Sequence, residues 1–220
     1  MIISRGRQYI FVHIPKTGGT SLALALEQRA MKDDIMLGDT PKATRRRRRV
    51  RGVESSGRLW KHSGLQDIRG LVTDAEIAAF KVFTMVRNPW DRIVSYYHWL
   101  REQSFDHPAV ARAKALEFSA FLNHPETRAG LSAHPYGRYV TDAQGALRCD
   151  LFVRLEHLEE DLPRLENLLD LRIAPLPHAN RSARDRDYSS YYSPADRDLV
   201  GELAAPDIER FEYTFTTSCK

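Results

Sequence analysis

The segment that most constrains the fold is a short apolar run that passes through a turn with one lysine and two glycines into a helix-forming run. Residues 9–14 are aromatic and β-branched, which predicts a buried parallel strand, and residues 22–30 predict a helix that begins just after Thr20 and Ser21. A turn between them directs backbone N–H groups, and the positive end of the helix dipole, toward one point. The segment therefore predicts an anion-binding cradle within an α/β fold.

The turn also supplies side chains that suit a phosphate or a sulfate. These are Lys16, Thr17, Gly18, Gly19, Thr20 and Ser21. The glycines permit a close approach of the backbone, the lysine adds a positive charge, and the hydroxyls add donors. A glycine-rich turn without a ligand is the alternative interpretation. The lysine precedes the glycines and no Lys-Ser/Thr pair opens the helix, so the order argues against an ordinary ATPase or GTPase.

A second strand and helix carry another candidate anion site. Residues 81–86 predict a buried strand, and Asn88 can cap a helix that has Pro89 in its first turn. Arg87 then lies at the carboxyl end of the strand, and Ser95 lies about two turns into the helix, outside its apolar stripe. A guanidinium group suits a phosphate dianion, whereas an ordinary surface ion pair is the alternative for Arg87.

The two motifs together resemble those of sulfotransferases. Pro15 to Ser21 is similar to their 5′-phosphosulfate-binding loop, most closely in the carbohydrate type, sulfotransferase family 2, which includes the heparan 2-O-sulfotransferases. The resemblance implies that residues 16–21 hold the 5′-phosphosulfate of 3′-phosphoadenosine 5′-phosphosulfate (PAPS). It implies that Arg87 and Ser95 hold its 3′-phosphate. It extends from Phe11 to about Phe215 and weakens between residues 31 and 58.

The resemblance also assigns a loop near the C-terminus to the nucleotide. Residues 176–188 are rich in proline, arginine and polar residues, which predicts a loop. In the family the corresponding loop folds over the nucleotide, so Asn180, Ser182 and Arg184 are candidate contacts for the 3′-phosphate and the adenosine. An ordinary surface loop is the alternative for each.

Alternating strands and helices predict one α/β domain over residues 1–220, with a central parallel sheet and the ligand at the carboxyl ends of its strands. The resemblance implies the three-layer arrangement related to P-loop kinases. Other predicted elements are helices near residues 73–80, over 109–123, from 155 and over 193–203, a strand at 150–154, a turn centred on Gly145 and an extended piece at 211–215.

Sulfuryl transfer requires a base that removes the proton of the attacking hydroxyl, and an imidazole suits this role. His62 is similar in position to the base of the carbohydrate sulfotransferases, and His13 is the main alternative. Lys16 would also stabilise the charge that builds on the oxygen bridging sulfur and phosphorus. The resemblance implies no metal, and the sequence has neither a His-Glu-x-x-His motif nor paired cysteines.

Residues 39–51 form an arginine-rich segment, predicted to be an inserted loop or helix. It holds Lys42 and six arginines against one acidic residue, although the whole chain has a net charge of only +4. Three interpretations stay open: a solvated surface, attraction of an acidic acceptor, or non-specific nucleic-acid binding. The last is disfavoured because no RNA-binding aromatic signature or helix-turn-helix accompanies the segment.

The two cysteines, Cys149 and Cys219, indicate no disulfide framework. The first residues do not resemble a secretory signal, and no apolar run approaches the ~20 residues that span a bilayer. We therefore expect a soluble, cytoplasmic enzyme of bacterial type that acts on a hydroxyl-bearing, carbohydrate or glycan-like acceptor. An ATP-dependent small-molecule kinase and a polyanion-binding module without catalysis are the alternative functions.

Overall fold

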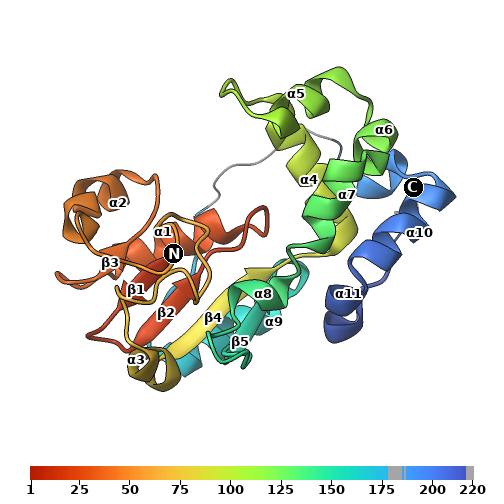
Figure 1. Cartoon of the computed structure of the whole chain (residues 1–220). Helices are drawn as coiled ribbons and strands as arrows, with labels where there is room; N and C mark the ends of the chain where they lie inside the picture. The colour runs from red at the N-terminus through yellow and green to blue at the C-terminus, as the bar shows by residue number, and fades with distance from the viewer. Residues whose placement is uncertain (178–184, 186, 217–220) are drawn as a thin grey trace. The chain divides into compact units, whose positions relative to one another are not determined.

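The structure is a computed structural model that describes residues 1–177, 185 and 187–216 (Figure 1). The chain divides into two compact units. Unit 1 comprises Met1–Val86 and Tyr136–Asn180, and unit 2 comprises Arg87–Pro135 and Arg181–Lys220. Each unit is described by itself, and the expectation of a single domain stays a prediction.

Unit 1 is built on a mixed five-stranded sheet with the strand order β3-β1-β2-β4-β5. Three strands are parallel: β2 (Tyr9–Val12), β4 (Lys81–Val86) and β5 (Leu151–Arg154). In the β2–β4 pair, Phe11 lies opposite Phe83. Two short strands, β1 (Ile2–Ser4) and β3 (Ile35–Met36), extend the sheet in antiparallel pairings. The predicted α/β class is thus confirmed, with a mixed rather than purely parallel sheet.

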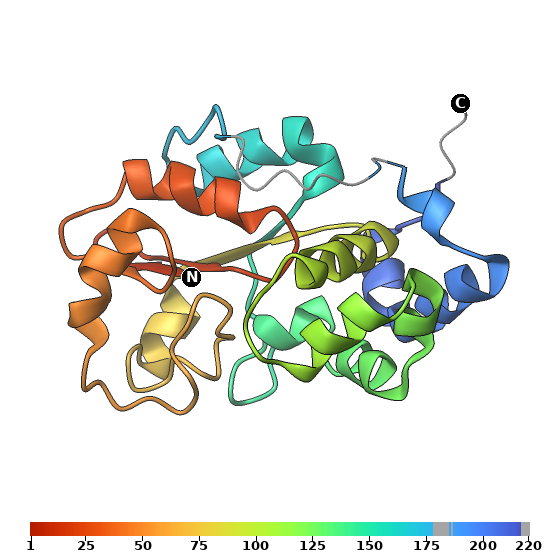
Figure 2. The same ribbon diagram turned by 90° about the horizontal axis from the view of Figure 1, so that it is seen from above.

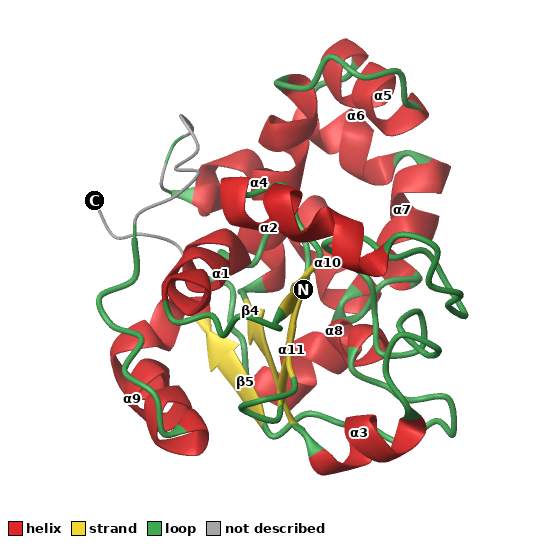
Figure 3. Ribbon diagram, turned by 90° about the vertical axis from the view of Figure 1, so that its left-hand side faces the viewer, coloured by secondary structure: helices red, strands yellow, loops and turns green. Residues whose placement is uncertain are grey.

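Alternating side chains of the strands form two hydrophobic cores, one on each face of the sheet. Phe11 and Phe83 pack with α1 (Gly19–Gln28) and α9 (Leu158–Leu169), whereas Ile10 and Val82 pack with α3 (Asp74–Ala79) on the other face. Figure 2 shows α1 and α9 above the sheet and α3 below it, and Figure 3 shows the strands between these helices. The layers therefore match the expected three-layer arrangement.

The loops and shorter helices of unit 1 lie around this sheet. The shorter helices are α2 (Pro41–Arg46), η1 (Arg47–Val50), α8 (Tyr136–Tyr139) and η2 (Leu155–His157). The arginine-rich segment is thus helical over most of its length. Thr73 caps α3 with a reciprocal capping box to Glu76, as the sequence predicts. Gly145 adopts a left-handed conformation (φ 83°) in the predicted turn.

Unit 2 is helical throughout its regular structure among the residues described. Its elements are α4 (Pro89–Arg101), α5 (Pro108–Ala115), α6 (Phe118–Asn123), α7 (Pro125–Ser132), η3 (Tyr188–Tyr191), α10 (Pro194–Leu203) and α11 (Ala205–Phe211). Its core contains the buried apolar face of α4, including Trp90, Val94 and Tyr97, with Phe121 and Val200. The predicted cap of α4 is confirmed, since Asn88 Oδ1 accepts from the Trp90 N–H at 3.1 Å.

Five boundary predictions are wrong. The helix expected over residues 22–30 begins earlier, at Gly19, and ends at Gln28. The strand from Tyr9 ends at Val12 rather than at residue 14. The helix expected over residues 109–123 is two helices, because Leu116 and Glu117 have extended backbones. The helix expected from Leu155 begins with one 3-10 turn. The piece expected to be extended from Phe211 starts with the last residue of α11, and the C-cap Glu212 has a left-handed conformation (φ 54°).

Within the described residues, no helix combines the length and the hydropathy that a membrane span requires.

Candidate active site

The loop between β2 and α1 contains two residues with left-handed backbones. Lys16 and Gly18 both adopt positive φ angles, 66° and 82°, and Gly18 is the N-cap of α1. A left-handed lysine is strained, and such strain tends to concentrate where a ligand is bound. The first turn of α1 contains no acidic residue, so no carboxylate of that turn neutralises the positive end of its dipole. The loop therefore presents a positive helix end and an adjacent lysine.

Buried contacts fix the shape of this loop from inside. Thr17 is fully buried, and its hydroxyl donates to the carbonyl oxygen of Ile14 at 2.9 Å. Thr17 thus stabilises the turn, whereas the side chains of Lys16, Thr20 and Ser21 are half-buried at its surface. A side chain at position 18 would place its Cβ 2.9 Å from Leu155 Cδ1, in addition to adopting a strained backbone. The chain can therefore follow this path most easily with glycine there.

Gly19 lies directly against the ring of His13. A Cβ at this position would lie 2.5 Å from His13 Cδ2 and 2.8 Å from His13 Nε2, so the ring would have to move. We expect Gly19→Ala to lower the free energy of unfolding by about 1–3 kcal/mol, the usual effect of overpacking. Chemical denaturation measures this change.

Gly130→Ala is the matched control, because the added Cβ would meet nothing within 4 Å inside a helix. It should leave stability unchanged or raise it by about 0.5–1 kcal/mol. Equal denaturation midpoints for the Gly19 and Gly130 variants would contradict the close contact with His13.

His13 and His62 lie side by side next to the loop. Their ring centroids are 4.9 Å apart, and His62 Nδ1 lies 2.7 Å from the carbonyl oxygen of His13. A carbonyl oxygen only accepts, so Nδ1 carries the proton and Nε2 has the lone pair of the neutral ring. His13 is 8% exposed, whereas His62 is half-buried. The geometry thus favours His62 as a base and His13 as the residue that orients it.

Burial keeps both rings neutral. It lowers the pKa of His62 to about 4, and the hydrogen bond to His13 partly offsets this effect. Burial also holds the pKa of His13 well below its usual value. Near neutral pH, His62 is therefore in the form that accepts a proton.

Buried Ser63 holds the turn that presents His62. Its Oγ accepts from the Trp60 N–H at 2.9 Å and lies 2.7 Å from the carbonyl oxygen of Arg58. Trp60 is 40% exposed, and its ring meets that of His62 edge to face with centroids 5.0 Å apart. Residues 58–63 thus form a preorganised turn with an exposed indole beside the candidate base.

Lys61 links this turn to the arginine-rich segment. Its Nζ donates to Asp39 Oδ2 at 2.6 Å, and Arg47 Nη2 lies 3.9 Å from the other oxygen of that carboxylate. The hydrogen bond from Lys61 is the main cause that lowers the pKa of Asp39. Arg47, Asp39 and Lys61 therefore form a row of charged side chains that leads from the arginine-rich segment to the residue next to His62.

The arginine-rich segment is only partly a solvated surface. Arg46 Nη1 donates to the carbonyl oxygens of Met31 and Asp34 at 2.8 and 3.1 Å, and Arg49 Nη1 donates to that of Asp34 at 2.8 Å. Lys42 Nζ donates to the carbonyl oxygen of Glu27 near the end of α1. Exposed arginines of the same segment are Arg45, Arg47, Arg48, Arg49 and Arg51. The segment thus combines structural anchors with an exposed basic face.

In unit 2, Arg87 is held by an acidic residue one turn further along. Its Nε and Nη2 lie 2.8 and 2.6 Å from Asp91 Oδ2, and the two side chains are 14% and 17% exposed. The ion pair considered as an alternative for Arg87 is therefore present, and it fixes the orientation of the guanidinium. Ser95 is buried in α4, at 5% exposure. The candidate contacts Asn180, Ser182 and Arg184 lie outside the described residues.

Comparison with known proteins decides the family. The sequence matches the family described as "Sulfotransferase family" over residues 1–214. The chain belongs to the sulfotransferase family. The family assignment made from residues 15–21, 87 and 95 is thereby confirmed, and the protein is a transferase. A comparison with curated proteins gives no match.

One solved structure similar to this sulfotransferase is described as the crystal structure of mouse sulfotransferase SULT7A1 complexed with PAP. The TM-score is 0.54 at 17% sequence identity, and the match covers 93% of this chain and 84% of the mouse chain. At this identity the match establishes a common fold.

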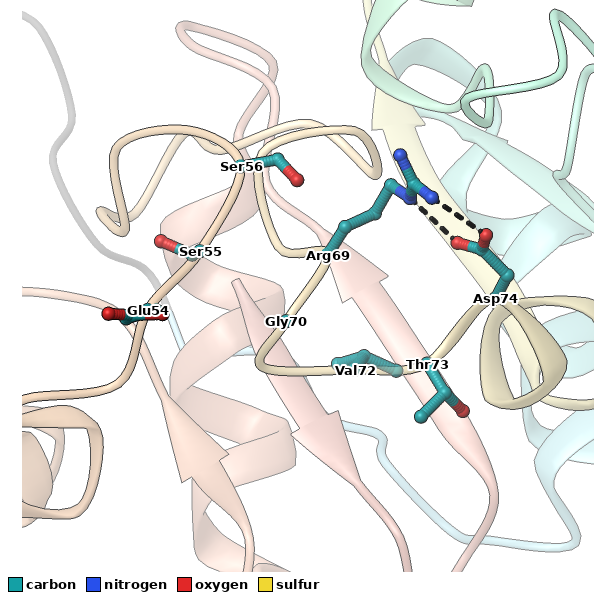
Figure 4. A pocket seen from close by; sticks show the side chains of 8 residues that line it. All are labelled: Glu54, Ser55, Ser56, Arg69, Gly70, Val72, Thr73 and Asp74. Carbon is teal, nitrogen blue, oxygen red and sulfur yellow. Dashed lines mark hydrogen bonds and ion pairs between the residues drawn. The ribbon is translucent and has the colours of Figure 1, made fainter.

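A hollow of about 440 Å³ in unit 1 of the sulfotransferase is lined by none of the predicted site residues. Figure 4 shows it between residues 54–56 and 69–74, with Arg69 paired to Asp74 at 2.8 Å. Within the described part of the chain, no group of three or more His, Cys, Asp or Glu residues is arranged to hold a metal ion. Independence from metals stays a prediction.

Sequence reasoning missed the surroundings of His62. It selected one residue from the run Trp60-Lys61-His62-Ser63, although all four take part in the turn. A tryptophan two positions before the candidate base was the available signal. No signal in the sequence indicates the pairing of Lys61 with Asp39, because the two residues are far apart in sequence.

Proposed function

We propose that this sulfotransferase transfers a sulfuryl group from PAPS to a hydroxyl of a carbohydrate or glycan-like acceptor, with His62 as the base. The observation that carries the proposal is the loop at the start of α1, with left-handed Lys16 and Gly18, packed against the His13–His62 pair. Anion binding and proton removal then take place within one part of unit 1.

The loop residues fit the phosphosulfate end of the donor. The N-terminus of α1 offers N–H groups and a positive dipole end, and Lys16 adds a full charge. Gly19 allows the backbone to lie against His13, where a larger residue would clash. The fold shared with a sulfotransferase described as a complex with PAP supports the same donor class.

We assign the 3′-phosphate to Arg87 and Ser95, with Asn180, Ser182 and Arg184 as further contacts of the nucleotide. Arg87 supports this assignment because Asp91 holds its planar donor group in one orientation. A preoriented guanidinium binds phosphate with little further loss of side-chain entropy.

The reaction follows from these positions. His62 Nε2 accepts the proton of the acceptor hydroxyl as its oxygen attacks sulfur, and the bond between sulfur and the bridging oxygen breaks. The products are the sulfate ester, 3′,5′-adenosine bisphosphate and the proton held on His62. Lys16 stabilises the negative charge that develops on the bridging oxygen, an effect larger in the transition state than in the ground state. We propose that no metal takes part, and that the enzyme is cytoplasmic and of bacterial type.

A thermal-shift experiment tests the donor. A ligand at 100 times its Kd stabilises the native state by about 2.7 kcal/mol. We expect 3′,5′-adenosine bisphosphate to raise Tm by several degrees, whereas ATP with magnesium should have little effect.

The same experiment separates the two alternative functions. A rise in Tm with ATP and magnesium, and none with the bisphosphate, would favour a small-molecule kinase and contradict the assignment of PAPS as the donor. A shift with heparin alone would favour a polyanion-binding module without catalysis.

A further inference from the structure

We infer that Trp60 is the platform on which a sugar ring of the acceptor stacks, and that Arg58 binds an anionic substituent of that ring. The inference rests on the proposed function and names the acceptor contacts of the same site. Trp60 is 40% exposed, although another tryptophan, Trp90, is buried at 6%. A large exposed indole beside a candidate base is typical of a binding surface rather than of a core.

The indole is held in place before any ligand arrives. Ser63, which is fully buried, accepts from the Trp60 backbone N–H and lies 2.7 Å from the Arg58 carbonyl oxygen. The edge-to-face contact with His62, at 5.0 Å between centroids, fixes the ring from one side. A preorganised aromatic ring loses little entropy on binding, which favours its use as a contact.

The chemistry of the turn selects a ring that carries negative charge. An indole face is electron-rich and packs against the apolar C–H face of a pyranose. The Arg58 guanidinium carbon lies over the Trp60 ring, 5.2 Å from its centroid, so the indole carries a positive charge on one of its faces. Residues 39–61 carry nine lysines and arginines but only two acidic residues. An acidic saccharide fits this surface better than a neutral one.

The contact between Trp60 and His62 would bring a bound sugar ring close to the candidate base. A ring stacked on Trp60 lies next to the imidazole, so a hydroxyl at its edge can approach His62 Nε2. Trp60 is thus proposed to determine acceptor specificity, whereas Lys16 and Arg87 are assigned to the donor.

The test measures saccharide binding directly, with and without saturating 3′,5′-adenosine bisphosphate. Calorimetry with a heparin hexasaccharide as the acidic probe, and maltohexaose as the neutral one, compares wild type with Trp60→Ala, Trp60→Phe and Arg58→Gln. Arg172→Gln is the matched charge control, because Arg172 is 90% exposed and belongs to the same unit. We expect the Kd for the hexasaccharide to rise at least tenfold in Trp60→Ala and only two- to threefold in Trp60→Phe. Arg58→Gln should weaken the acidic probe but not the neutral one, and Arg172→Gln should change neither.

Two outcomes would overturn the inference. Unchanged hexasaccharide affinity in Trp60→Ala, which keeps every positive charge, would mean that the arginines alone capture polyanions. If Trp60→Ala kept the wild-type affinity for the hexasaccharide but raised the pKa of His62, which NMR measures, Trp60 would only shield His62 from water. Bisphosphate binding by every variant shows that the fold and the donor site are intact. If the wild type did not bind the bisphosphate, the proposed function would be contradicted instead. The saccharide titrations would still test Trp60.

Discussion

Replacement of His62 with alanine is expected to lower the rate of sulfuryl transfer by about 10²- to 10⁴-fold, the usual contribution of a positioned general base. The side chain donates from Nδ1 to the His13 carbonyl oxygen at 2.7 Å, which leaves Nε2 as the proton acceptor. Alanine removes that acceptor but leaves the loop of residues 15–21 in place. Binding of 3′,5′-adenosine bisphosphate should therefore stay close to that of the wild type, and rapid-quench assays with radiolabelled donor measure the loss of transfer.

The pH dependence of the reaction gives an independent check on His62. Because the pKa of His62 is lowered to about 4, the free enzyme holds it neutral through the neutral range. The value of kcat/KM should therefore fall only as the pH drops toward 4. Bound donor brings negative charge close to the ring, which favours the protonated form, so the fall in kcat should begin at a higher pH.

Stability should change with pH in the same direction. The folded-state pKa of His62 lies below the unfolded value of 6.5, so unfolded chains bind more protons between these values. The free energy of unfolding should therefore decrease as the pH falls from about 6.5 toward 4, and it should decrease less steeply in His62→Ala.

His157→Ala is the control, because His157 is an exposed histidine of the same unit, 3.3 Å from Glu160. It should transfer sulfate at the wild-type rate. Full turnover by His62→Ala, with loss of turnover in His13→Gln, would move the base role to His13.

Replacement of Lys16 with alanine should reduce kcat by about 10²- to 10³-fold, as expected when a group that stabilises transition-state charge is removed. Lys16 adopts a left-handed backbone next to the N-terminus of α1, where a leaving phosphate would be held. In the proposed reaction its ammonium stabilises the charge on the bridging oxygen, and donor binding should weaken as well. Steady-state kinetics at varied donor concentration separates the two effects.

Lys32→Ala removes one exposed charge from the same unit and should leave kcat unchanged. If Lys16→Ala raised the donor KM but kept the wild-type kcat, Lys16 would bind ground state and transition state equally, and its catalytic role would be refuted.

Prediction from sequence succeeded where the deciding interactions are local. The capping box of Thr73 and Glu76 and the cap at Asn88 connect residues two or three positions apart. The turn at Gly145 likewise depends on one backbone conformation. No strand was predicted at β1 or β3, because strands of three and two residues are too short to show an alternating pattern.

The contacts around the candidate base could not be predicted from neighbouring residues in the sequence. The carbonyl oxygen that orients His62 belongs to His13, 49 residues earlier, and the carboxylate that pairs with Lys61 is Asp39. The arginine-rich segment is uniform in sequence, yet only folding shows that Arg46 and Arg49 donate to backbone carbonyl oxygens. Such pairings depend on how distant segments meet in the folded chain.

The sequence by itself determined the family, the succession of strand, turn and helix within residues 9–30, and the identity of the candidate base. These follow from residue type and short spacing, since helix ends and glycine turns are formed by neighbouring residues. The tertiary structure decided which nitrogen of His62 donates to the His13 carbonyl oxygen, and it decided that Trp60 lies exposed beside that ring. It also decided that burial keeps the imidazole neutral. These properties depend on contacts between distant segments and on exclusion of water, which exist only once the chain has folded.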